Sequence, residues 1–212
     1  MTASAPWPAL KRDLVAILRG IRPDETATIV AELLDAGFEA VEIPLNSPDP
    51  FRSIEIAAGV APKGTLIGAG TVLDTESVDR LASAGGTLMV SPNVDAMVLA
   101  RAGGHGMVTL PGVFTPTEAF AALRAGASGL KFFPASVLGS SGVAAIRAVL
   151  PLQTVIAAVG GVADKDFAAW GMVGVRAFGL GSSLYKPGMT AEDVGRNARA
   201  AVAAWDAVFA GE

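Results

Sequence analysis

One stretch of the chain, residues 14–45, reads LVAILRGIRPDETATIVAELLDAGFEAVEIPL and holds a complete strand–helix–strand pattern. The runs that begin at Leu14 and Ala40 are nearly continuous in apolar residues, which is typical of parallel strands covered on both faces. Between them, Pro23-Asp24-Glu25 is a helix start signal and Ala36-Gly37 is a stop signal. The stretch therefore predicts two parallel strands joined by a helix.

The same alternation continues along the chain. Further strand-like runs begin near Thr65, Leu88, Gly106, Gly129, Thr154 and Val175, and each is followed by a segment with helical periodicity. Later helices are bounded by Thr75-Glu76 and Ala84-Gly85, by Thr117-Glu118 and Ala125-Gly126, and by Thr190 and Phe209. Eight strand–helix units in about 210 residues predict an α/β fold, a closed (β/α)8 TIM barrel, with an open doubly wound sheet as the alternative. We expect a single domain over residues 1–212, with a short helix around Trp7 to Lys11 capping the bottom.

Composition narrows the classes of function. The 212 residues are 51% apolar, enough for one sizeable core, and the net charge of −4 comes without a basic stripe for nucleic acid. Cysteine is absent, which excludes disulfides and thiolate chemistry. The longest apolar runs fall short of the ~20 residues that cross a bilayer, and Lys11, Arg12 and Asp13 interrupt any signal peptide. We expect a cytoplasmic protein that acts on small molecules and binds neither membrane nor nucleic acid.

Two ionisable residues interrupt strands that are otherwise apolar. Lys131 lies in Gly129-Leu130-Lys131-Phe132-Phe133-Pro134, and Glu42 lies in Ala40-Val41-Glu42-Ile43-Pro44-Leu45. Burial lowers the pKa of a lysine, and a neutral amine can attack a ketone or aldehyde to form a Schiff base. A nearby carboxylate can move protons directly or through one water. The alternative is a buried ion pair with a purely structural role.

Other side chains can be sorted by their place along the strands, because catalytic groups of such barrels gather at the C-terminal ends. Arg19 and Thr71 end the first and third predicted strands, so we expect them at the same mouth as Lys131 and Glu42. A rim salt bridge for Arg19 and a turn role for Thr71 are the alternatives.

Three further residue types are assigned structural roles. His105 precedes the fifth strand, which puts it in a loop at the bottom. Tyr185 is expected to pack after the last strand, and Phe132 and Phe133 are expected in the core.

Two glycine-containing turns follow the last two predicted strands, Val159-Gly160-Gly161-Val162 and Gly179-Leu180-Gly181-Ser182-Ser183. Glycine lets backbone N–H groups approach an anion closely, and barrels often bind phosphate at this place. Neither nucleotide-binding glycine fingerprint is present. The turns indicate a phosphorylated substrate rather than a nucleotide.

Three classes of function fit these features: a lysine-dependent aldolase, a metal-free phosphosugar isomerase and a non-catalytic phosphometabolite binder. A zinc-dependent aldolase needs a cluster of His or Cys ligands, which one histidine and no cysteine cannot build. Lys131 discriminates among the three, because only the aldolase requires this amine to form a covalent adduct.

Four motifs carry a resemblance to a known family over nearly the whole chain. They are the segments 37–48 (GFEAVEIPLNSP), 67–72 (IGAGTV), 130–134 (LKFFP) and 158–162 (AVGGV). With these motifs the chain resembles the short class I barrel aldolases, which cleave 2-keto-3-deoxy-6-phospho sugar acids into pyruvate and glyceraldehyde 3-phosphate.

The resemblance implies a role for each matching residue. Lys131 would form the Schiff base, Glu42 would donate and accept protons, Arg19 and Thr71 would lie near the pyruvate carboxylate, and Gly161, Gly181 and Ser182 would hold the phosphate. It also implies that no cofactor is required and that the protein is a homotrimer.

Within this family the chain looks like the branch that acts on the galactonate epimer. The gluconate branch carries Thr-Leu-Arg-Thr after the strand-two glutamate and a threonine at the position of Val159. Here Ile43-Pro44-Leu45-Asn46 follows Glu42 and a valine replaces the hydroxyl residue. Val159 is therefore expected to set the preference at C4, with the gluconate epimer or dual specificity as the alternative.

Overall fold

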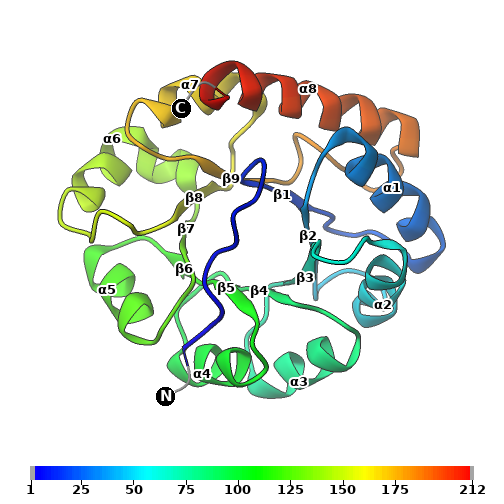
Figure 1. The fold of residues 1–212 in the computed structure, drawn as a ribbon, viewed down its shortest axis with the longest axis horizontal. Coiled ribbons are helices and arrows are strands. Elements are labelled where there is room, and N and C mark those ends of the chain that lie inside the picture. The colour runs from blue at the N-terminus through cyan, green and yellow to red at the C-terminus, as the bar shows by residue number, and fades with distance from the viewer. Residues whose placement is uncertain (1–2, 211–212) are drawn as a thin grey trace.

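The computed structural model describes residues 3–210 and shows a closed (β/α)8 barrel in a single domain (Figure 1). All strand pairs are parallel, in the order β5-β4-β3-β2-β1-β9-β8-β7-β6. The strands are β1 (Leu14–Ile17), β2 (Ala40–Pro44), β3 (Leu66–Gly70), β4 (Leu88–Val90), β5 (Val108–Leu110), β6 (Gly112–Val113), β7 (Leu130–Phe132), β8 (Ile156–Val159) and β9 (Ala177–Leu180). Because the two end strands of the sheet, β5 and β6, are consecutive in the chain, the sheet closes on itself. The barrel is confirmed and the open sheet is wrong.

The fifth predicted strand is split into β5 and β6 by Pro111. Proline has no backbone N–H and cannot continue a ladder as a donor. The strand changes partners there: β5 pairs with β4, and β6 pairs with β7. The Pro111 carbonyl still accepts a hydrogen bond of 3.0 Å from the Lys131 N–H. This split strand is the joint at which the barrel closes.

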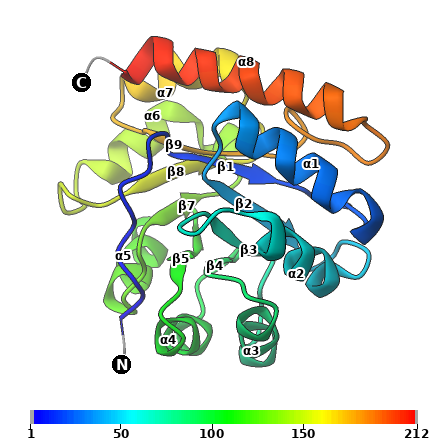
Figure 2. The ribbon, with the colours of Figure 1, turned by 45° about the vertical axis from the view of Figure 1, so that its right-hand side comes forward.

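Helices surround the strands, as Figure 2 shows. They are α1 (Pro23–Ala36), α2 (Pro50–Val60), α3 (Thr75–Ser83), α4 (Ala96–Gly104), α5 (Pro116–Arg124), α6 (Ala135–Arg147), α7 (Phe167–Gly171, after the 3₁₀ turn Asp164–Asp166) and α8 (Ala191–Phe209). Capping explains their starts: the side chains of Asp74, Asp95, Thr115 and Thr190 accept hydrogen bonds from first-turn N–H groups. Among residues 3–210, none of the helices combines the length and apolarity needed to span a bilayer.

Two apolar cores follow from the alternation of side chains along each strand. The larger lies between the strands and the helices and contains Phe38, Phe132, Phe167 and Phe178, all almost fully buried. The smaller fills the barrel interior with Val15, Ile17, Leu88, Leu110, Val159 and similar residues. Inward-facing positions are therefore known for every strand, and any polar side chain at such a position lies inside the barrel.

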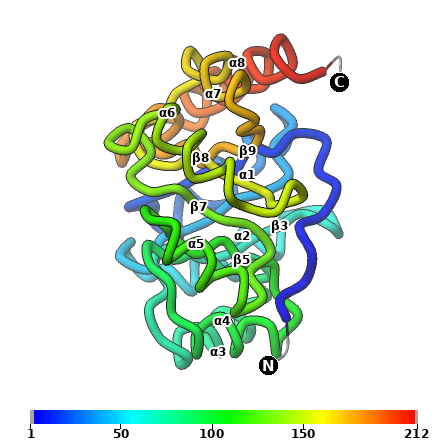
Figure 3. Tube along the Cα trace, turned by 90° about the vertical axis from the view of Figure 1, so that its left-hand side faces the viewer, coloured from blue at the N-terminus to red at the C-terminus, as the bar shows by residue number. Residues whose placement is uncertain are grey.

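The N-terminal segment, residues 3–13, crosses the bottom of the barrel, where the strands begin, and we call it the N-terminal strap (Figures 1 and 3). It contains no helix, so the helix expected around Trp7 to Lys11 is wrong. Pro6 and Pro8 keep the residues before them out of helical conformation. Its backbone bonds across instead, with Ser4 N–H donating to the Gly126 carbonyl (3.1 Å) and Ala5 N–H to the Met107 carbonyl (3.0 Å).

The strap still closes the bottom of the barrel. Ala5, Trp7 and Leu10 pack against the inner core, and the Trp7 Nε1–H donates to Asp13 Oδ1 at 2.8 Å. These side chains thus close the bottom of the barrel, which is the role expected of the helix. The opposite end of the barrel stays open.

Candidate active site

A cavity of about 150 Å³ opens at the C-terminal end of the strands. It is lined by Ile17, Arg19, Glu42, Lys131, Phe133, Val159, Gly160, Gly161, Val162, Gly179, Gly181 and Ser182. Seven of the eight residues predicted for the site are in this lining. Grooves of about 410 and 520 Å³ lie among the connections at the other end of the barrel. The smaller cavity is the better candidate, because it alone of these three contains a buried amine and a buried carboxylate.

Lys131 is placed in the barrel by its position on β7. Leu130 and Phe132 point to the outer core, so Lys131 points inward, and its side chain is only 5% exposed. The Nζ atom lies 4.8 Å from the centre of the Phe133 ring. Burial lowers the pKa of Lys131, Glu42 opposes this shift, and the positive charge of Arg19 adds to it. The arrangement favours the neutral, nucleophilic amine.

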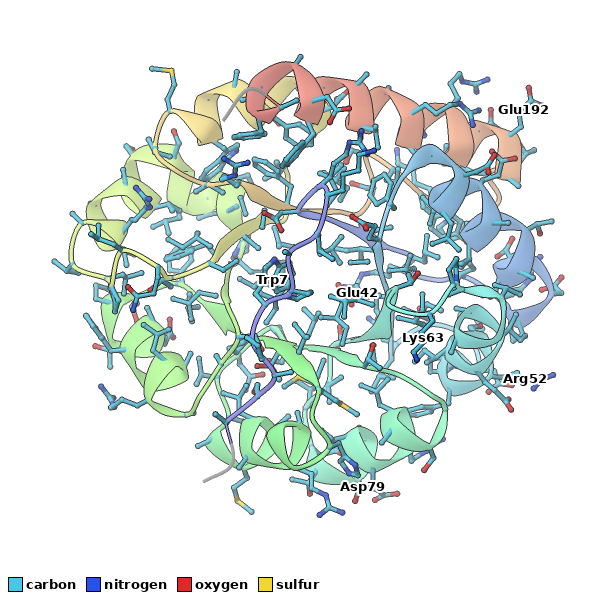
Figure 4. The ribbon with its side chains drawn as sticks, in the orientation of Figure 1. Trp7, Glu42, Arg52, Lys63, Asp79 and Glu192 are labelled. Atoms are coloured by element: carbon cyan, nitrogen blue, oxygen red, sulfur yellow. The ribbon has the colours of Figure 1, made fainter. Side chains whose placement is uncertain are left out.

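Glu42 faces the same space from β2, where it is 2% exposed (Figure 4). Burial raises the pKa of its carboxyl group, against the opposing effects of Lys131 and then Arg19. Its Oε2 atom is buried and has no hydrogen-bond partner among residues 3–210. Among the described residues, Glu42 and Lys131 do not form an ion pair within 4 Å. The two groups line one cavity without forming a direct ion pair, so both are available to a substrate bound there.

Arg19 and Thr71 differ in how they relate to the cavity. Arg19 is exposed at the rim and its Nη1 donates to Asn46 Oδ1 at 2.5 Å. Thr71 is partly exposed directly after β3 and is not among the lining residues. Its φ of 58° is in the left-handed region, which is unusual for a β-branched residue. Backbone strain of this kind is typical of functional sites.

The two glycine-containing turns meet at the cavity, as expected. Gly160 and Gly161 have φ of 91° and 74°, and Gly161 approaches Ser136 so closely that a Cβ would lie 2.4 Å from the Ser136 Oγ. Gly181 and Ser182 come from the turn after β9. Val159, 6% exposed, turns its side chain into the cavity beside them.

Several lining residues were missed or assigned to the core from sequence. Phe133 lines the cavity although it was expected in the core, Ile17 was given no role, and Val162 and Gly179 were named only as members of the two glycine-containing turns. Period-two alternation holds the signal for three of these: Phe133 lies two residues after Lys131, Ile17 two after Val15, and Gly179 two after Ala177.

His105 and Tyr185, which were also expected to be structural, lie outside the cavity. The His105 Nε2 is 2.7 Å from Asp79 Oδ1 on the outer surface between α3 and α4, where Arg101 also pairs with Asp79. Tyr185 is buried and its hydroxyl donates to Glu25 Oε1 at 3.1 Å. Within residues 3–210, no group of three or more His, Cys, Asp or Glu side chains is placed to hold a metal ion.

Comparisons with known proteins agree on one family. The family model of the KDPG and KHG aldolases matches residues 9–199. The probable 2-dehydro-3-deoxy-6-phosphogalactonate aldolase of Rhizobium meliloti (strain 1021) is 63% identical over 207 residues, which are 98% of each chain. The 2-dehydro-3-deoxy-6-phosphogalactonate aldolase of Escherichia coli (strain K12) is 48% identical over 195 residues, 92% of this chain and 95% of that protein.

A solved structure described as "Native KDPGal structure" superposes with a TM-score of 0.93 at 47% identity and covers 96% of this chain and 98% of that one. With a matching family model over most of the chain and relatives this similar over nearly their full length, the chain belongs to the KDPG and KHG aldolase family.

Proposed function

We propose that the protein is a lysine Schiff-base aldolase that cleaves 2-dehydro-3-deoxy-6-phospho-D-galactonate reversibly to pyruvate and D-glyceraldehyde 3-phosphate. One observation carries this proposal: the Lys131 amine is buried, its pKa is lowered, and Glu42 faces the same cavity without pairing with it. A nucleophilic amine and a carboxyl group able to hold or release a proton are the two groups that Schiff-base cleavage requires.

In the proposed cycle the Lys131 Nζ attacks the C2 carbonyl of the keto acid to give a carbinolamine. Glu42 gives its proton to the departing C2 hydroxyl, so that loss of water forms the protonated Schiff base and leaves Glu42 as a carboxylate. The protonated Schiff base withdraws electrons from the C3–C4 bond. Glu42 takes the proton of the C4 hydroxyl while that bond breaks, which releases glyceraldehyde 3-phosphate and leaves an enamine. The enamine regains a proton at C3 from Glu42, and hydrolysis of the Schiff base releases pyruvate and restores the amine.

The polar groups around the cavity fit the two charged ends of this substrate. Arg19 at the rim would offer a guanidinium to the carboxylate, and Thr71, which follows β3 outside the cavity lining, would offer a hydroxyl. The backbone N–H groups near Gly161 and Gly181 and the Ser182 hydroxyl, from the turns after β8 and β9, would hold the phosphate. The reacting carbons would lie next to Lys131 and Glu42.

Trapping the intermediate tests the mechanism. Incubation with pyruvate and borohydride should add the mass of one pyruvic acid less one oxygen atom to the wild type, because Schiff-base formation loses water and reduction adds two hydrogens, and the adduct should map to Lys131. The Lys131→Met variant should gain no mass, whereas Lys63→Met, which removes an exposed lysine far from the cavity, should react like the wild type. Absence of an adduct under conditions that modify a control lysine aldolase would reject the proposal.

The epimer preference rests on Val159. A hydrocarbon side chain cannot satisfy a substrate hydroxyl that points toward it, so the C4 configuration that turns the hydroxyl away from Val159 is favoured. Relatives at 63% and 48% identity carry the galactonate name, which supports this choice. A coupled pyruvate assay on both epimers should give a higher kcat/KM for the galactonate compound than for the gluconate compound. In Val159→Thr the ratio of these two kcat/KM values should be smaller. Equal rates on the two epimers would contradict the assignment.

We further propose that the protein works as a cytoplasmic homotrimer. Four exposed apolar side chains lie on the side of the cavity, in the loops after β3 and β6 and in the first turns of α4 and α6: Leu73, Phe114, Met97 and Val137. Apolar groups of this size at one end of the barrel are candidates for burial between copies. Light scattering on a size-exclusion column should give three times the mass of the chain, and activity should remain in the soluble fraction of fractionated cells.

A further inference from the structure

Two glycines, Gly68 and Gly70, occupy successive inward positions of β3, whereas Ala69 between them packs in the outer core. Neither has a positive φ, so the backbone conformation alone does not demand glycine at either position. The space around each of them must provide the reason.

The two positions differ in what an added side chain would meet. At Gly68 a Cβ would lie 1.8 Å from the Leu88 carbonyl oxygen, which is backbone of the neighbouring strand β4. At Gly70 a Cβ would lie 1.5 Å from Glu42 Oε2, and the three nearest atoms all belong to the Glu42 carboxyl group. Gly68 is therefore required for strand packing, and Gly70 makes room for one functional group.

The register of β2 and β3 explains this contact. Glu42 is level with Gly68, and Pro44 is level with Gly70. The Glu42 side chain therefore leans toward the C-terminal end of the barrel and rests on the bare α-carbon two positions along the neighbouring strand. Nothing there donates a hydrogen bond to Oε2. The charged groups that act on this carboxyl are Lys131 on β7 and Arg19 after β1.

We propose that Gly70 is a positioning residue for Glu42. Because glycine has no side chain, the Glu42 carboxyl group can lie against the backbone at position 70, which sets its position relative to Lys131 and keeps it buried without a hydrogen-bond donor. The inference rests on the proposed function, in which Glu42 moves the proton of the C4 hydroxyl. An alanine at position 70 displaces the carboxyl group from the wall of the barrel toward the axis, since the two cannot occupy the same space.

The first test is kinetic. A displacement on the scale of 1 Å at a proton-transfer group costs roughly 100-fold, so Gly70→Ala should lower kcat by about 10- to 100-fold. KM should change little, because the groups that would hold the two ends of the substrate are untouched. The acid limb of the kcat profile should move to lower pH, because a carboxyl group pushed toward the open cavity is better hydrated. The borohydride adduct at Lys131 should still form.

The second test is a double-mutant cycle in thermal stability, which needs no activity. Gly70→Ala should lower Tm by several degrees in the wild type but by little or nothing in Glu42→Ala, where the clash is absent. Gly59→Ala is the matched control: it lies on α2, nothing is within 4 Å of its would-be Cβ, and it should leave kcat unchanged.

The outcomes separate the two proposals. Unchanged kcat and pH profile in Gly70→Ala, with a normal Lys131 adduct, would overturn the role of Gly70 and leave the aldolase standing. Equal Tm losses in both backgrounds would also overturn it, since Gly70 would then be needed for packing against other atoms. No adduct in the wild type would reject the aldolase, while the stability cycle would still report on Gly70.

Discussion

The Thr71→Gly variant tests whether the strained backbone at Thr71 lowers the stability of the fold while serving the candidate active site. The φ of 58° at Thr71 places a β-branched residue in the left-handed region, which costs about 1–2 kcal/mol relative to an unstrained residue. Glycine adopts this conformation freely but loses about 0.5–1 kcal/mol through the greater entropy of its unfolded chain. The Thr71→Gly variant should therefore be as stable as the wild type or more stable by about 1 kcal/mol, which is roughly 2–4 °C in Tm for a chain of this size.

Activity should move in the opposite direction. A hydroxyl that donates to the substrate carboxylate forms a bond to a charged group, worth about 1.5–3 kcal/mol, so kcat/KM should fall about 10- to 100-fold. Thermal denaturation and a dehydrogenase-coupled pyruvate assay would measure the two effects on the same preparation.

Asp49 supplies the matched control. It is the other described non-glycine residue with positive φ (40°), it is exposed at the N-cap of α2, and its side chain makes no capping hydrogen bond. Asp49→Gly should gain a few tenths of a kcal/mol, because aspartate tolerates this conformation better than threonine, and should keep full activity. A Thr71→Gly variant that is clearly less stable than the wild type would refute the strain, and one with wild-type kcat/KM would remove Thr71 from the site.

Three further predictions concern buried polar groups. Because the folded-state pKa of Glu42 is raised, the folded state binds this proton more tightly, and its contribution to stability falls as pH rises from the ordinary value of 4.5 through the raised one. The free energy of unfolding of Glu42→Gln should thus equal that of the wild type below pH 4.5 and exceed it at pH 8. Its kcat should fall about 10²–10⁴-fold. A stability gain that is independent of pH would contradict this. Trp7→Phe removes the hydrogen-bond donor to Asp13, a carboxyl group whose pKa is raised by burial. The free energy of unfolding should therefore fall by about 1–3 kcal/mol, and it should fall more at pH 8 than at pH 4. Equal losses at both pH values would show that only packing changed. Ser53 has a buried hydroxyl without a partner, so Ser53→Ala should leave unfolding free energy unchanged or raise it by about 1 kcal/mol, and a loss above that size would reveal an unrecognised partner.

Local sequence signals were enough to predict the barrel. Apolar runs followed by segments with helical periodicity repeat eight times, and each strand except β6 begins within two residues of its expected position. The position of Lys131 and Glu42 inside the barrel also followed, because one charged residue in a buried strand must face either the lumen or the helices, and only the lumen opens to solvent.

What the sequence did not show depends on contacts between distant segments. The strap was expected to be helical because its contacts with Met107 and Gly126 are not visible in its own residues. Pro111 gives no signal of the split strand, because an interruption of one residue does not disturb an apolar run. The role of Gly70 needed the register of two strands, since a glycine in a strand can be explained in several ways until its neighbours are known.

The N-terminal strap also has a consequence for the joint where the barrel closes. The hydrogen bonds of Ser4 and Ala5 tie down the chain just before β5, which is the first half of the strand that Pro111 interrupts, and shortly before β7, which pairs with the second half. Lys131 belongs to β7 and donates its N–H to the Pro111 carbonyl. Ser4 and Ala5 thus restrain the part of the barrel wall that carries the Lys131 amine, although they lie at the opposite end of the barrel from the candidate active site.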